Sequence, residues 1–535
     1  MSDALLVREA RVRTMDGGRP RASAFFVERG RFVAVGEPGE AEAAAREAEA
    51  RGVAVRVFDA AGRTITPGLI DAHVHAGLAA DRSLDLSLRG TRTRAEALEL
   101  VARAHAALPA GEWLVGSGQR AVEWDEPADR EALDRAAPGR AVYLAGYDAH
   151  GAWVSSAALA RAGVTRATPD PPGGTIGRDP AGEPDGRLQE GAMTLVRSVI
   201  PPADRARRER ALAAFLRGAA GRGVTAIHDF EEPATWNRLL ELRDAGELAV
   251  RVWFGFMLGG LTGEHGTLAD LPAPGAIAAA EDERVRAFAL KGVLDGALGS
   301  RTAHLLEPYA GGTDRGLCTL DAAGATAQAE EARRRGYSLA LHAIGDAASR
   351  AALDHFASWP GAERERLRPR VEHAQLVDPT DLPRFAALGV VVSMQPQHAV
   401  ADRPLARALW GERDERGGFA WAQLLATGAV LAFGSDAPVE ALDPRAGLHA
   451  AVIGGDPEAH ARGDKPARAI SLDAAFAAYT TGAAFAARAE DEVGRIAPGL
   501  QADFVAWDDD PWAVPVERLP ALTVFATYVG GAPVV

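Results

Sequence analysis

The sequence of 535 residues is poor in cysteine, because Cys318 is the only one. A single cysteine forms no internal disulfide, and it cannot supply the several thiolates of a cysteine-rich zinc finger or an iron–sulfur cluster. Any transition metal must therefore bind through imidazole and carboxylate groups, and the chain has 13 histidines to offer. No histidine or second cysteine lies near Cys318 in the sequence, so we expect it to be a packing residue.

Long apolar runs are also missing, and we expect no signal peptide. No stretch of about 18 uncharged apolar residues occurs, which argues against a transmembrane helix. The first residues lack a basic segment followed by an apolar one, so they do not resemble a signal peptide. We therefore expect a cytoplasmic protein that has no membrane partner.

Basic residues are outnumbered, since 59 Lys and Arg against 73 Asp and Glu give a formal charge of −14. This charge opposes phosphate polyanions, so we expect a small-molecule substrate and no nucleic acid partner. The rest of the composition, 47 % hydrophobic and 25 % charged, is typical of globular proteins.

The middle of the chain alternates short apolar strands with helical segments, which is the pattern of a parallel sheet. Eight strands are predicted, at Leu69–His75, Val224–Asp229, Val250–Met257, Ala287–Asp295, Ser338–Ala343, Arg370–Gln375, Val390–Gln395 and Val430–Asp436. Helices are predicted at Arg94–Leu108, Arg205–Gly218, Ala322–Arg335 and Leu472–Arg488. Eight βα units favour a closed (β/α)8 TIM-type barrel of the α/β class. An open doubly wound sheet is the alternative, but no Gly-x-Gly-x-x-Gly motif follows a strand.

Both termini are rich in predicted β-strands, so we expect them to form one discontinuous domain. These strands are Leu5–Val12, Ala24–Glu28, Arg31–Val35, Val53–Asp59, Asp503–Trp507 and Thr523–Tyr528. The expected organisation is a composite β domain of residues 1–66 and 490–535 and a barrel of residues 67–79 and 191–489. Residues 80–190 are too long for a βα crossover and predict an insertion after the first barrel strand. Such insertions shape or cover active sites.

Polar side chains stand at the C-terminal ends of the predicted strands, where barrel enzymes place catalytic groups. His73 and His75 are two residues apart, so they face one side of their strand and can bind one metal ion. The alternative is a hydrogen-bonded polar pair. His342, His373 and Asp436 end three other strands; each alone is typical of a structural residue, but the set favours a metal site.

Lys291 lies within an apolar strand, and Asp295 shares its face. A buried lysine is costly unless it is paired or its pKa is lowered. The residues leave two interpretations open: an ion pair with Asp295 or a similar carboxylate, and a modified or metal-linked lysine.

Several fragments occur in an order that resembles the amidohydrolase superfamily, and specifically amidohydrolase family 3, the branch of YtcJ-like proteins and N-substituted formamide deformylases. They are Pro67–His75, Asp295–Ala303, His342–Asp346, Glu372–Gln375, Ser393–His398, Phe433–Asp436 and Pro498–Phe504. The resemblance implies a metal-dependent hydrolase on a distorted (β/α)8 barrel, with a small β-sandwich made by both termini. It also suggests a homodimer.

The family pattern implies a role for six of these residues. His73, His75 and Asp436 bind one metal ion, His342 and His373 bind a second, and a carboxylated Lys291 bridges the two. Zn²⁺ suits this ligand set, with Mn²⁺ or Fe²⁺ and a single ion as alternatives. Asp436 is then the general base and acid of hydrolysis by metal-activated hydroxide.

Further residues are predicted to contact the substrate or to support the ligands. The predicted substrate contacts are Asp148, His150, Asp295, Arg301, Gln395 and His398. Asp229 is predicted to lie behind the ligands and to hold the tautomer of a ligand histidine.

The leading functional hypothesis is hydrolysis of a linear amide or formamide C–N bond in a small molecule. Deamination of a heterocycle is the alternative, although no His-x-x-Glu occurs at the fifth or sixth strand. Ester or lactone hydrolysis uses the same chemistry. A non-catalytic barrel serving as a binding protein is the alternative from another class, and such a protein would lack some of the six ligands.

Overall fold

The computed structural model describes residues 4–119, 124, 126–146, 151–171, 174–201, 203–258, 268–464 and 466–535. Residue contacts divide the chain into one unit of Met1–Ala79 with Leu212–Val535 and a second unit of Ala80–Ala211. Within the described ranges, no helix has the length and apolar character needed to cross a membrane.

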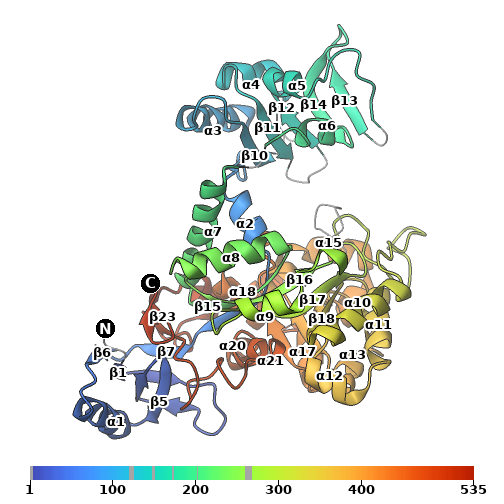
Figure 1. The fold of residues 1–535 in the computed structure, drawn as a ribbon. Helices are drawn as coiled ribbons and strands as arrows, with labels where there is room; N and C mark the ends of the chain where they lie inside the picture. The colour runs from blue at the N-terminus through green and yellow to red at the C-terminus, as the bar shows by residue number, and fades with distance from the viewer. Residues whose placement is uncertain are drawn as a thin grey trace. The chain divides into compact units, whose positions relative to one another are not determined.

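Eight parallel strands form the central sheet of the first unit, and helices such as α8 (Pro233–Asp244), α10 (Ala322–Arg335) and α11 (Asp346–Ala357) lie outside it (Figure 1). In sheet order the strands are β21 (Leu431–Phe433), β20 (Val391–Met394), β19 (Arg370–His373), β18 (Ser338–Ala343), β17 (Val285–Val293), β16 (Arg251–Met257), β15 (Val224–Glu231) and β8 (Leu69–Val74). The predicted (β/α)8 barrel is confirmed, and each strand ends within three residues of its predicted position.

The barrel closes between its first and last strands, just beyond their ends. The backbone N–H of Asp436 donates to the His73 carbonyl at 2.7 Å, and that of His75 donates to the Ala437 carbonyl at 2.9 Å. The short strand β21 therefore joins β8 through the residues that follow it. This closing seam carries three of the predicted metal ligands.

Two predicted elements are broken. The predicted helix Leu472–Arg488 is two helices, α20 (Leu472–Ala478) and α21 (Thr481–Ala486), because the Tyr479 carbonyl accepts the Ile70 N–H of β8 at 2.7 Å. The predicted strand Leu5–Val12 is β1 (Ala4–Arg8) and β2 (Arg11–Arg13), because Glu9 between them has a left-handed φ of 53°. Cys318, predicted to pack inside, is exposed.

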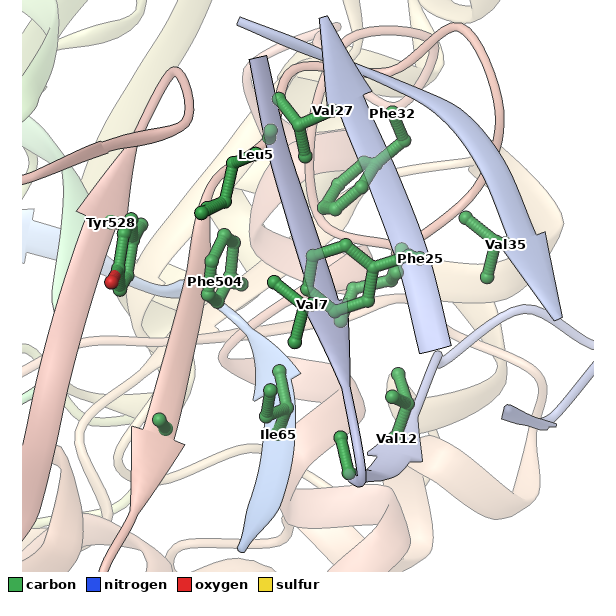
Figure 2. Packing of buried hydrophobic residues seen from close by; sticks show 14 of the residues in the cluster. Leu5, Val7, Val12, Phe25, Val27, Phe32, Val35, Ile65, Phe504 and Tyr528 are labelled. Atoms are coloured by element: carbon green, nitrogen blue, oxygen red, sulfur yellow. The ribbon is translucent and has the colours of Figure 1, made fainter. Parts of the chain in front are cut away.

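Strands from both termini form a small β-sandwich. One sheet has the order β5 (Arg31–Gly36), β4 (Ala24–Glu28), β1, β6 (Val55–Asp59). The other is β24 (Ala532–Pro533), β23 (Val524–Val529), β22 (Phe504–Trp507), β7 (Thr64–Pro67), β2, β3 (Arg21–Ala22). Figure 2 shows their side chains meeting in one cluster, in which the Phe25 and Phe504 rings pack edge to face at 5.0 Å. Helix α1 (Pro38–Ala50) packs on β1, β4 and β5.

The second unit has a sheet of its own, with the order β13 (Gly174–Arg178), β14 (Pro184–Glu190), β12 (Gly151–Val154), β11 (Val142–Gly146), β10 (Leu114–Gln119), β9 (Leu86–Ser87). Helices α3 (Arg94–Ala107), α4 (Arg130–Ala136), α5 (Ser156–Arg161) and α6 (Met193–Arg197) accompany it. Its core includes Val101, Leu133, Leu144 and Trp153. The predicted substrate contacts Asp148 and His150 fall outside the described residues.

Candidate metal centre

Three predicted ligands meet at the closing seam of the barrel. His75 Nε2 lies 3.2 Å from Asp436 Oδ1, and His73 Nε2 lies 3.6 Å from the same oxygen. All three side chains are buried. Asp436 has a left-handed φ of 58°, a conformation that non-glycine residues keep mainly at functional sites. These three groups form a cluster with the donor atoms of a metal site.

Hydrogen bonds hold the Nδ1 atoms of the two imidazoles, so that their Nε2 atoms lie near Asp436. His73 Nδ1 donates to Glu372 Oε2 at 2.6 Å, and His75 Nδ1 donates to the Phe230 carbonyl at 2.6 Å. Burial and the charge of Lys291 lower the pKa of His73 to about 3, so its ring is neutral at neutral pH. His73 Nε2 is buried without a hydrogen-bond partner. A neutral imidazole with an unpartnered inward nitrogen fits a divalent cation.

Asp436 provides the anionic ligand of this cluster. Burial would raise the pKa of Asp436, but the hydrogen bond from His75 and the neighbouring imidazoles hold it well below its usual range. Burial lowers the pKa of His75, and Asp436 more than compensates, so the pKa of His75 is raised. His75 and Asp436 therefore form a close pair at 3.2 Å, and a cation bound between them would replace a proton of that pair.

A buried charged network lies behind His73. The carboxylate of Glu372 accepts the guanidinium of Arg370 through two nitrogens as well as His73 Nδ1–H, and both side chains are fully buried. Arg370 also hydrogen-bonds His228 Nδ1 at 2.9 Å and the Ala72 carbonyl at 2.8 Å. Sequence reasoning assigned no role to Glu372 or Arg370. The sequence signal for this pair is that two opposite charges stand two residues apart in an apolar strand, and so on the same face.

His373 and Lys291 lie beside the first cluster. His373 Nδ1 lies 2.8 Å from Gln395 Oε1 and 3.9 Å from Asp436 Oδ2. Burial lowers the pKa of Lys291 to about 8, and its Nζ lies 5.3 Å from the Phe230 ring centre. Gln395, predicted to touch substrate, holds His373.

The ion pair between Lys291 and Asp295, one of the two interpretations of this lysine, is not present among the described residues. Asp295 is fully buried and instead accepts the backbone N–H groups of His304, Ile344 and Gly345 at 2.8–3.0 Å. It therefore joins the segments that follow β17 and β18, and the substrate contact predicted for it stays a prediction.

A second cluster of possible ligands lies beside the first. It consists of His373, His398 and Asp436, whose ligand atoms all lie within 4.8 Å of one another. The predicted ligand His342 lies next to it, with its ring 4.6 Å from that of His373. His342 Nε2 donates to the Gly296 carbonyl at 2.9 Å, which leaves Nδ1 as the unprotonated nitrogen of the neutral ring.

The structure also places Asp229 and Arg301, two further residues predicted to support the site. Asp229 accepts the Ala76 N–H at 2.8 Å, at the start of α2 (Ala76–Arg82). The Nδ1–H groups of His73 and His75 are accepted by Glu372 and the Phe230 carbonyl, so the tautomer-setting role of Asp229 stays a prediction. Arg301 is exposed after β17, with a left-handed φ of 55°.

Comparison with known proteins agrees with this geometry. A model of the amidohydrolase family matches residues 56–535. The chain belongs to the amidohydrolase family. This amidohydrolase is therefore a hydrolase that acts on carbon–nitrogen bonds other than peptide bonds.

Similar proteins cover nearly the whole chain. N-substituted formamide deformylase of Arthrobacter pascens is 29 % identical over 98 % of this chain and 97 % of its own. Protein LONG AFTER FAR-RED 3 of Arabidopsis thaliana is 32 % identical over 98 % of this chain and 91 % of its own. The crystal structure of an uncharacterized metal-dependent hydrolase from Pyrococcus horikoshii shares the fold, with a TM-score of 0.77 and 23 % identity. The match covers 96 % of this chain and 99 % of that one.

Proposed function

We propose that this amidohydrolase uses a divalent cation to hydrolyse a linear amide or formamide bond of a small molecule. The observation that carries the proposal is the buried set of His73, His75 and Asp436, in which His73 Nε2 has no hydrogen-bond partner. The similarity to the Arthrobacter pascens formamide deformylase supports the substrate class.

Zn²⁺ fits the imidazole and carboxylate donors of this set. A divalent cation there supplies Lewis acidity, which brings the pKa of water towards about 7 and polarises a carbonyl group. A second cation would be held by His373 and by His342, whose free Nδ1 suits it. Lys291 would complete the site as a carbamate, because its lowered pKa leaves part of the amine uncharged and able to react with CO₂.

Asp436 is proposed as the proton carrier. Its carboxylate is ionised at neutral pH and lies at the centre of the cluster, so it can accept a proton from the attacking water. The same group then delivers this proton to the nitrogen of the leaving amine as the C–N bond breaks. Water and amide are thereby converted to a carboxylic acid, formate in the case of a formamide, and a free amine.

Metal analysis combined with a substrate screen tests the proposal. We expect the purified protein to hold a transition metal, and to hydrolyse N-formyl or N-acyl amines until a chelator is added. His73→Ala should lose both metal and activity. His460→Ala is the matched control, because His460 lies on another element, α19 (Pro457–Ala461), and its Nε2 hydrogen-bonds Glu517 at 2.8 Å. A metal-free protein whose properties do not change in His73→Ala would overturn the proposal.

A further inference from the structure

His398 is a buried histidine of the site whose inward nitrogen has no partner. It lies on α14 (Pro396–Ala401), which follows β20, and its side chain is 6 % exposed. Its Nε2 lies 3.7 Å from Asp436 Oδ2, which is too far for a hydrogen bond. No hydrogen-bond partner of this nitrogen is present among the described residues. A buried nitrogen without a hydrogen-bond partner indicates a position where an atom of a bound molecule would complete its bonding.

The other ring nitrogen of His398 shows which tautomer the ring adopts. Gln375 Nε2 lies 3.1 Å from His398 Nδ1. An amide NH₂ group only donates, so this contact makes Nδ1 the acceptor. The other end of the amide, Gln375 Oε1, has no hydrogen-bond partner among the described residues.

The direction of the hydrogen bond from Gln375 fixes the tautomer of the His398 ring. With Nδ1 accepting, the proton of the neutral ring sits on Nε2. That nitrogen is then a hydrogen-bond donor, and it has no lone pair to offer a metal.

We infer that His398 Nε2–H donates a hydrogen bond to the carbonyl oxygen of the substrate as that oxygen gains negative charge, and that Gln375 fixes the donor tautomer. The inference rests on the proposed function, since it assigns His398 a partner in the amide substrate. It also separates His398 from the ligands in its cluster. Loss of one donor to a developing oxyanion lowers kcat by about 10²–10³-fold.

Three variants and two measurements test the assignment on the full-length, metal-loaded protein. His398→Phe removes the donor, and we expect kcat to fall by about 10²–10³-fold with unchanged metal content and a small change in KM. His398→Gln restores an N–H near Nε2 and should recover part of kcat. In Gln375→Glu the carboxylate accepts a hydrogen bond from Nδ1–H, so the ring proton moves to Nδ1 and Nε2 is unprotonated. This variant should therefore lower kcat as His398→Phe does. A metal lost in His398→Phe would show a ligand instead and overturn the inference.

Nuclear magnetic resonance of ring-¹⁵N histidine gives a readout independent of activity. The His398 signals, assigned by their loss in His398→Gln, should show a protonated Nε2 and an unprotonated Nδ1. An unprotonated Nε2, or a direct coupling to ¹¹³Cd in cadmium-substituted protein, would refute the donor role. If the wild-type protein cleaves no amide, the proposed function fails, whereas the tautomer is still measured.

Discussion

Replacing Glu372 should lower both the stability of the barrel and the affinity of its metal site. Glu372→Gln leaves the Arg370 guanidinium without its counter-charge, and both side chains are fully buried, so solvent cannot screen the change. Removing one partner of a buried ion pair costs about 3–5 kcal/mol of unfolding free energy. Metal affinity should fall by about 10- to 100-fold, because a neutral amide orients His73 less firmly than a carboxylate.

The double variant Arg370→Met with Glu372→Gln sharpens the test. It removes the unpaired cation, so most of the lost stability should return, while the metal affinity should remain low. Urea unfolding in chelator measures stability without a metal contribution, and competitive titration measures affinity. Glu490→Gln is the control, because Glu490 pairs with Arg368 at a partly exposed position and should cost at most about 1 kcal/mol. A double variant as unstable as Glu372→Gln, or one with full metal affinity, would refute the reasoning.

Three other outcomes follow from the same geometry. Asp436→Asn should lower kcat by more than the about 10²–10⁴-fold typical of lost acid–base catalysis, since metal is lost too; steady-state kinetics with metal analysis checks this. Because burial lowers the pKa of Lys291 from 10.5 to about 8, the uncharged amine increases as pH rises through 8, so carbamate formation should increase likewise. A ¹³C signal from labelled bicarbonate should report it, and its persistence in Lys291→Ala would contradict the assignment. Phe504→Ala should destabilise the β-sandwich by about 3–5 kcal/mol in thermal unfolding, and a loss below 1 kcal/mol would argue against the packing in Figure 2.

Elements set by local pattern were predictable, and elements set by distant partners were not. The eight barrel strands follow from short apolar runs separated by helical segments, and α10 has the predicted bounds Ala322–Arg335. The break at Tyr479 depends on an N–H of Ile70, far away in the sequence. Helical periodicity carries no information about that bond, so the sequence pattern predicts one continuous helix.

The same distinction applies to the candidate site. The His-x-His pair and the strand-end position of Asp436 are visible in the sequence, and the structure brings these three residues together. Glu372 is separated from its partner His73 by 299 residues, so only barrel closure and strand register make them neighbours. The amide that fixes His398 comes from the segment after another strand. Residues that hold the imidazoles from behind, such as Glu372 and Gln375, therefore cannot be identified from the sequence pattern alone.

The closing seam explains why the site sits where it does. Strand β21 is short, and the barrel is completed by backbone bonds of His73, His75, Asp436 and Ala437. The same backbone that closes the sheet thus brings the two imidazoles and the carboxylate to one point, without any contribution from a flexible loop. A cation bound to these side chains would join the first and last strands a second time. Metal binding and barrel closure are consequently linked, and the loaded protein must be the more stable form.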